Sequence, residues 1–132
     1  MIVIDTSALI AILQDEPERS QFAAVIARAD RRLISAVSFL EAGIVARSRR
    51  GEVGLTALDE IVSDAELEII PFDDIQRRLA VQAFNQYGKG IHPSARLNFG
   101  DCAAYALAKA MNAPLLFKGT DFVATDLISA SA

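Results

Sequence analysis

A short apolar run at the amino end constrains the fold of this chain more than any other sequence feature. Ile2, Val3 and Ile4 are consecutive apolar residues, and Asp5 ends the run at once. A strand with one face in water alternates apolar and polar residues, whereas a strand buried on both faces does not. The run therefore predicts a central strand of a parallel sheet that helices cover on both sides.

Further short apolar runs predict the other strands. We expect them at residues 33–37, 67–70 and 115–117, with a possible edge strand at 127–129. Helical patterns separate these runs, and a strand–helix alternation is typical of α/β folds with right-handed crossovers. The chain has 132 residues, which suits one domain with one core. We therefore expect a single α/β domain whose central parallel sheet of four to five short strands has helices on both faces.

Six helices are expected between the strands, at residues 8–13, from 15 to about 29, 38–50, 55–63, 73–87 and 99–110. Ser38 and Glu41 have the S-x-x-E spacing of a capping box at the start of the third helix, and Gly51 and Gly54 close it. Asp73 or Asp74 and then Asn98 can cap later helices. Four apolar residues predict the buried side of the 73–87 helix, namely Ile75, Leu79, Ala83 and Phe84.

Charge and the rare residue types exclude several classes of protein. The 13 basic and 17 acidic residues give a net charge of −4, so the molecule lacks the basic field of a nonspecific nucleic-acid binder. Cys102 and His92 are the only residues of their types, which excludes a disulfide scaffold and paired-histidine zinc sites. We interpret Cys102 as core filler and His92 as a loop residue. No segment approaches the roughly 18 uncharged apolar residues of a membrane helix, so we expect a cytoplasmic protein without membrane attachment.

Four carboxylates are expected at one edge of the sheet. Asp5 and Asp121 follow the first and fourth strands, and Glu41 and Asp101 lie in the first turns of helices. The carboxyl ends of parallel strands and the amino ends of the following helices share an edge, where ligands bind. Each acid taken singly also has a structural explanation, because Asp, Glu and turn residues of this kind cap helices or favour the helix dipole.

Taken together, the four acids point to a metal site. Like charges at one edge destabilise the fold unless protons or cations intervene. Oxygen ligands without Cys or His select a hard cation, Mg²⁺ or Mn²⁺, and such a cation supports phosphodiester hydrolysis. The sequence has no Ser-His-Asp or Cys-His device and no glycine-rich phosphate loop.

Four motifs in this order resemble PIN-domain ribonucleases, most closely the VapC toxins of bacterial toxin–antitoxin pairs. They are Val3-Ile4-Asp5-Thr6-Ser7-Ala8-Leu9, Ser38-x-x-Glu41, Leu97-Asn98-Phe99-Gly100-Asp101-Cys102 and Lys118-Gly119-Thr120-Asp121-Phe122. The resemblance covers nearly the whole chain and implies one PIN domain over residues 1–132.

The same resemblance implies an activity and partners. The activity is Mg²⁺- or Mn²⁺-dependent endoribonuclease cleavage of cellular RNA, such as tRNA, rRNA or mRNA. Asp5, Glu41, Asp101 and Asp121 match the family's acidic quartet and would be both the catalytic residues and the metal ligands. The implied partners are a second copy of the chain and a VapB-type antitoxin.

Four further residues could position the RNA. Ser7 and Thr120 lie beside the acids, and Lys89 and Arg96 belong to a basic loop that could hold the RNA backbone. Each has an alternative interpretation as a turn or solvated loop residue. Asp126 could join the metal site, or it could cap the last short strand.

Two other functional classes remain open. A receiver-like module also has an acid after its first strand and a lysine after a late strand, as Asp5 and Lys118 are here. Against it, the chain lacks paired acids after the first strand and an acceptor aspartate after the third. A PIN-derived domain that binds without cutting is the other alternative.

Overall fold

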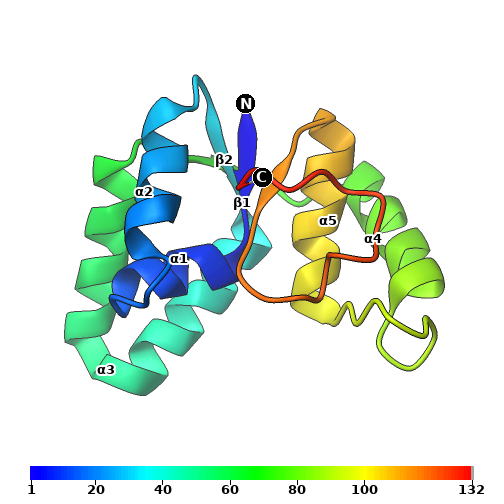
Figure 1. Ribbon diagram of the computed structural model, residues 1–132. Coiled ribbons are helices and arrows are strands. Elements are labelled where there is room, and N and C mark those ends of the chain that lie inside the picture. Colours follow the sequence, from blue (N-terminus) through cyan, green and yellow to red (C-terminus); the bar gives the residue numbers. More distant parts are fainter. Residues whose placement is uncertain (132) are drawn as a thin grey trace.

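The computed structural model, which describes residues 1–131, has a four-stranded parallel sheet between two layers of helices (Figure 1). The strands are β1 (Ile2–Ile4), β2 (Arg32–Ser35), β3 (Glu68–Ile70) and β4 (Leu115–Leu116). Their spatial order is β3-β2-β1-β4, with every pair parallel. The strand β1 is buried along its whole length and lies between β2 and β4, as its apolar run predicts.

The strand order has a switch point at β1. The chain proceeds from β1 to β2 and β3 on one side, then returns to place β4 on the other side. Val3 is paired with Leu33 of β2 and with Leu115 of β4. The backbone N–H of Asp5 donates to the carbonyl of Leu116 at 2.9 Å. Asp5 therefore lies at the switch point of the sheet, where open α/β sheets bind ligands.

Helices cover both faces of the sheet, which confirms the predicted fold class. They are α1 (Thr6–Leu13), α2 (Arg19–Arg28), α3 (Ala36–Asp64), α4 (Asp74–Tyr87) and α5 (Phe99–Met111). Figure 1 shows α1, α2 and α3 on one side, and α4 and α5 on the other. Each side has its own hydrophobic cluster, and neighbouring residues of β1 divide between them: Ile4 packs with α1 and α2, and Val3 with α5.

The predicted start of α3 is wrong by two residues. The strand β2 ends at Ser35, and Ser35 caps the helix by accepting a hydrogen bond from the N–H of Val37. Ser38 is fully buried within the first turn, so the predicted Ser38–Glu41 capping box does not form and Glu41 lies in the second turn. Two serines three residues apart offer alternative caps, and the length of β2 selects the earlier one.

Only one of the two glycines predicted to end the helix interrupts it. Gly51 has a φ of 62° and kinks α3, which then continues to Asp64. Gly54 is buried against the preceding half of α3, where an added β-carbon would lie 3.1 Å from the carbonyl carbon of Ala46. The second glycine therefore permits close packing across the kink.

Two other boundaries also differ from the prediction. The helix α2 begins at Arg19, later than expected, because Asp15 takes a left-handed φ of 53° after α1. The expected edge strand at 127–129 is reduced to an isolated bridge between Leu115 and Ser129, so the described residues form four strands.

The predicted buried side of α4 is partly wrong. Ile75 is 65% exposed and Phe84 is 39% exposed, whereas Gln76, Ala83 and Tyr87 are buried. Ala83 and Tyr87 pack into the cluster around α5, so the position of α5 decides which side of α4 is covered. In the described part of the chain, no helix combines the length and the apolar character that crossing a membrane requires.

Candidate metal and catalytic site

The fold brings the four predicted acids together at the switch point of the sheet. Asp5 follows β1, Asp121 follows β4, Asp101 lies in the first turn of α5, and Glu41 extends from α3. Electrostatic repulsion links Asp5 with Glu41, and it links Asp101 with both Asp5 and Asp121. The two acids that meet Asp5 come from opposite sides of the sheet, so only the tertiary structure unites them.

Asp5 is almost completely buried, with an exposed fraction of 3%, and hydrogen bonds fix its side chain. It caps α1, and its Oδ2 accepts from the Ser7 N–H at 3.0 Å and from the Ser7 hydroxyl at 2.6 Å. Burial raises the pKa of Asp5 to about 6, the Ser7 hydrogen bonds oppose this rise, and the charge of Glu41 adds to it. The structural role as a cap and a place in the site therefore coexist in one residue.

Ser7 also connects the two sides of the site. Its hydroxyl accepts from the backbone N–H of Lys118 at 2.9 Å, just after β4. The Lys118 ammonium contacts the carboxylates of Glu16 and Glu18 at 2.8 and 3.3 Å. No local sequence pattern predicts this ion-pair cluster, because Lys118 is about one hundred residues from both glutamates and only the fold makes them neighbours.

Asp101 forms the capping box that its position suggests. Its N–H donates to Oδ1 of Asn98 at 2.9 Å, and its Oδ2 accepts from the Asn98 N–H at 3.1 Å. Burial raises the pKa of Asp101 to about 8. The charges of Asp5 and Asp121 and a side-chain hydrogen bond with Asp121 add to this rise, whereas the hydrogen bond from Asn98 opposes it. The cap thus fixes a carboxyl group whose ionisation its acidic neighbours disfavour.

Glu41 reaches across to the amino end of α5. Its carboxyl group lies against Gly100, so closely that an added β-carbon there would be 2.6 Å from Oε1 and 2.7 Å from Cδ. No role of Gly100 was predicted from the sequence. The available signal was a glycine inside a helix, where alanine is intrinsically preferred.

Of the four residues predicted to contact RNA, three are exposed and one, Ser7, is hydrogen-bonded within the site. Asp121 is half-buried, and its carbonyl accepts from the N–H of Arg96 at 3.5 Å, which brings the basic loop to the site. Thr120, Lys89 and Arg96 are exposed. Ser7 has its hydroxyl engaged by Asp5 and Lys118, as described above.

Asp126 lies elsewhere, and both predictions for it are wrong. It accepts from the Tyr105 hydroxyl at 2.6 Å and from the Lys109 ammonium at 2.8 Å. These bonds fasten the carboxyl-terminal segment to α5. His92 has its Nδ1 accepting from the N–H groups of Ser94 and Ala95, in agreement with its interpretation as a loop residue.

The donor set fits a hard divalent cation. All four groups are carboxylates. Burial raises the pKa values of Asp5 and Asp101, and the charges of neighbouring carboxylates add to the rise, so a bound cation would favour the ionised forms. Within residues 1–131, no three His, Cys, Asp or Glu side chains lie close enough together to hold a metal ion by themselves. Mg²⁺ usually keeps several waters and takes one or two carboxylates plus phosphate oxygens, so it needs no closed protein cage.

Comparison with known proteins shows the family of this chain. The PIN domain family profile matches residues 2–127. The chain is 48% identical to ribonuclease VapC28 of Mycobacterium tuberculosis, over 92% of this chain and 91% of that protein. It is 46% identical to a ribonuclease VapC of Mycolicibacterium smegmatis, over 96% of this chain and 97% of the relative.

Solved structures share the fold at lower identity. The Mycobacterium tuberculosis toxin VapC20, described as cleaving the Sarcin-Ricin loop, superposes with a TM-score of 0.78 at 15% identity, over 97% of each chain. A toxin–antitoxin complex from Klebsiella pneumoniae has a TM-score of 0.70 at 19% identity, over 100% of this chain and 98% of that one. The family profile and the close relatives favour the nuclease hypothesis over a receiver-like module. The chain therefore belongs to the PIN domain family and, within it, to the VapC ribonucleases.

Proposed function

We propose that this chain is the toxin of a type II toxin–antitoxin pair and cleaves cellular RNA in the cytoplasm as a Mg²⁺- or Mn²⁺-dependent endoribonuclease. The observation that carries the proposal is the convergence of Asp5, Glu41, Asp101 and Asp121 at the switch point of the sheet. PIN-domain VapC ribonucleases are generally metal-dependent, and the acids of this chain form a suitable donor set.

The four carboxylates would hold the cation and the chain would orient the RNA around it. A hard cation, when bound, neutralises phosphate charge and stabilises the leaving oxygen while water adds to phosphorus. Ser7 fixes the Asp5 carboxylate through two hydrogen bonds. Burial and the charges of Asp5 and Asp121 raise the pKa of Asp101, so binding of a cation should be accompanied by proton release from the acids.

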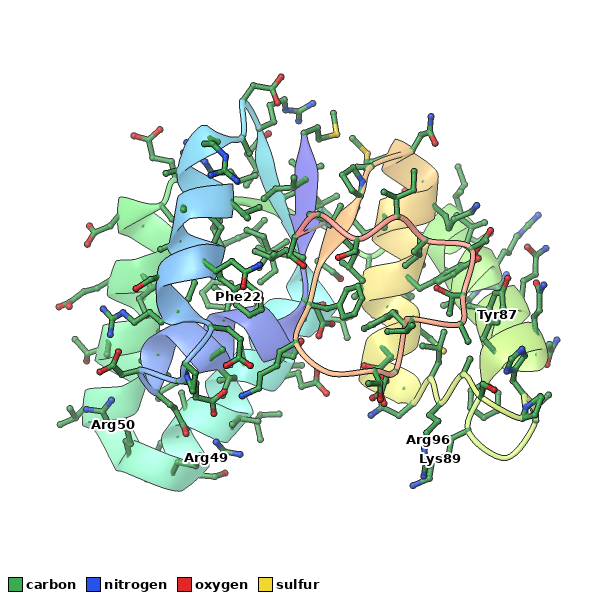
Figure 2. The ribbon with its side chains drawn as sticks, viewed as in Figure 1. Phe22, Arg49, Arg50, Tyr87, Lys89 and Arg96 are labelled. Carbon is green, nitrogen blue, oxygen red and sulfur yellow. The ribbon has the colours of Figure 1, made fainter. Side chains whose placement is uncertain are left out.

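Basic residues beside the acids would hold the RNA backbone. Figure 2 shows Lys89 and Arg96 together at one edge of the molecule, and the Arg96 backbone contacts Asp121. Neither side chain forms an ion pair with another residue of the described chain, so both charges are available to phosphates. Thr120, also exposed, would offer a hydroxyl group to the RNA.

Exposed apolar residues near the acids support the proposed protein partners. Leu40 and Ile44, one turn apart on α3, are 64% and 59% exposed, and Phe99 at the start of α5 is 84% exposed. The contact between Glu41 and Gly100 makes these two helix segments neighbours. Clustered apolar exposure is typical of interaction sites. We assign this surface to a homodimer and further propose a VapB-type antitoxin as the second partner, in line with the toxin–antitoxin complexes among the structural neighbours.

The proposed activity is tested with purified protein and structured RNA. We expect cleavage with Mg²⁺ or Mn²⁺ and none with a chelator. Asp5→Asn and Asp101→Asn should each reduce cleavage by at least ~100-fold while circular dichroism remains that of a folded protein. Asp59→Asn is the matched control, because Asp59 is an exposed acid on the outer part of α3.

The outcomes separate the remaining hypotheses. Sequencing of the cleaved RNA ends in cells that express the protein would identify the substrate. Equal cleavage by the parent and the folded Asp5→Asn and Asp101→Asn proteins would exclude the proposed site. Metal-dependent RNA binding without cleavage would instead favour a PIN-derived binding domain.

A further inference from the structure

We propose that Gly100 is a positioning residue, because its missing side chain leaves the space in which the Glu41 carboxylate joins the other acids. This inference rests on the proposed function, since it concerns the arrangement of the same metal-binding acids. It assigns Gly100 a role that its neighbours Asn98 and Asp101, which cap α5, do not share.

The geometry makes Glu41 the occupant of the space beside Gly100. Gly100 is buried, and the three atoms nearest to an added β-carbon would all belong to the Glu41 carboxyl group. Two of them, Oε1 and Cδ, would lie at 2.6 and 2.7 Å, and real β-carbons essentially never approach other atoms within 3.0 Å. The Glu41 carboxylate thus fills the volume that any side chain at residue 100 would need.

The backbone gives no other reason for a glycine at this position. Gly51, Gly90 and Gly119 have positive φ angles, which favour glycine, but Gly100 is not among the positive-φ residues. It belongs to the regular helix α5, where alanine would be intrinsically better. The glycine is therefore explained by what lies beside it.

This packing brings together acids from distant parts of the chain. Glu41 extends from the second turn of α3 to the amino end of α5, where the helix dipole favours a negative charge. Asp101 is the next residue after Gly100, and Asp5 interacts with Glu41. A methyl group on residue 100 would push the Glu41 carboxylate away from both. Because a carboxylate ends a flexible side chain, it can rotate away while the backbone stays in place, so function and stability should separate.

The first experiment compares Gly100→Ala with Gly43→Ala. Gly43 is a matched control because it also lies in a helix, and its added β-carbon would be 3.8 Å from Leu55 Cδ2, an ordinary contact. We expect Gly100→Ala to weaken Mn²⁺ binding, measured by calorimetry or electron paramagnetic resonance, and RNA cleavage by about 10- to 100-fold, with no fall in Tm. Gly43→Ala should retain both properties. Parent-like Mn²⁺ affinity and cleavage in Gly100→Ala would overturn the inference.

The second experiment asks whether Gly100 acts through Glu41. Glu41→Asp shortens the side chain by one methylene group and should make room for the alanine. We expect Gly100→Ala to cost less than about 3-fold in the Glu41→Asp background, against the larger loss in the parent, because residues in contact couple. The same fold-loss in both backgrounds would overturn the inference.

A stability measurement covers the case in which Gly100→Ala does not fold. In the Glu41→Ala background, the added methyl group has no carboxylate to meet, and Gly100→Ala should leave Tm unchanged or raise it. A lower Tm in that background would overturn the inference. If the parent binds Mn²⁺ but cuts no RNA, the proposed function fails, and Mn²⁺ affinity still tests the role of Gly100.

Discussion

At the scale of one residue, Asp5 combines contacts that stabilise the fold with a buried position that disfavours its charged form. Its carboxylate caps α1 and accepts two hydrogen bonds from Ser7, which are stabilising contacts. Its burial and its proximity to Glu41 nevertheless disfavour the charged form. The charge is useful only with a cation beside it, so the same residue should weaken the metal-free protein and stabilise the metal-bound one.

The pH dependence of stability follows from the raised pKa of Asp5. An acid with a raised pKa in the folded state favours folding below its unfolded pKa, here 3.8, and this contribution is lost as the pH rises through about 6. Without divalent cations, Asp5→Asn should be nearly as stable as the parent at pH 4 and more stable at pH 8. The gain at pH 8 should be at most about 3 kcal/mol, because one pKa unit corresponds to about 1.4 kcal/mol.

Urea unfolding of both proteins at the two pH values, with a chelator present, checks this expectation. Excess Mg²⁺ should reduce or reverse the difference at pH 8, since only the parent retains the Asp5 carboxylate. A difference between parent and variant that is the same at pH 4 and pH 8 would show that Asp5 ionises as easily in the folded chain as in the unfolded chain.

At the scale of elements, α3 serves three purposes along its length. Its first turns carry Glu41 to α5, its kink at Gly51 lets the two halves fold against each other, and its outer face presents Leu40 and Ile44. The start of α5 is similar, because it fixes Asp101 through a capping box and leaves Phe99 exposed. The two helix starts therefore combine a half-buried acidic side with an exposed apolar side.

The exposed side of these helices predicts a homodimer interface. Ile44→Glu should convert a dimer of the purified chain into a monomer, because a buried unpaired charge at an interface is strongly unfavourable. Size-exclusion chromatography with light scattering gives the mass directly. Ile75→Glu on α4 is the control, since Ile75 is similarly exposed but lies on another helix. A monomeric parent would contradict the prediction.

At the scale of the whole molecule, the net negative charge of the protein opposes binding of RNA, which is also negatively charged. The net charge is −4, and the acids at the switch point add local repulsion. Lys89 and Arg96 form a basic group beside that site. Arg28 instead lies in the last turn of α2, shortly before β2 begins, and so near the amino ends of the strands, away from the site. Attraction is therefore expected to be local, from a bound cation and from this loop.

The contribution of the loop appears in the salt dependence of RNA binding. In the Asp101→Asn background, which should prevent cleavage, Lys89→Ala/Arg96→Ala should weaken binding. It should also reduce the slope of log affinity against log salt by about 1.4, at about 0.7 per single-strand phosphate contact. Fluorescence anisotropy over a salt series measures both quantities. Arg28→Ala should change neither, and an unchanged slope in the loop variant would place the RNA elsewhere.

Local sequence signals predicted much of this architecture. The unbroken run Ile2 to Ile4 is the buried central strand, and Asp73 and Asn98 cap the helices that follow them. These features depend on interactions between residues within a few positions of each other, so they can be predicted from short stretches of sequence. The position of each acid after a strand or near a helix start was predicted in the same way.

Long-range packing decided the rest. Which serine caps α3, which side of α4 is buried and where Asp126 binds all depend on partners from other elements. The contact between Glu41 and Gly100 depends on how α3 and α5 pack together, and these two helices are far apart in the sequence. By itself the sequence determined the elements and the kinds of side chain at their ends, since hydrogen bonding and periodicity are local. Only the tertiary structure decided which carboxylates meet, because that depends on steric fit between segments that are distant in the chain.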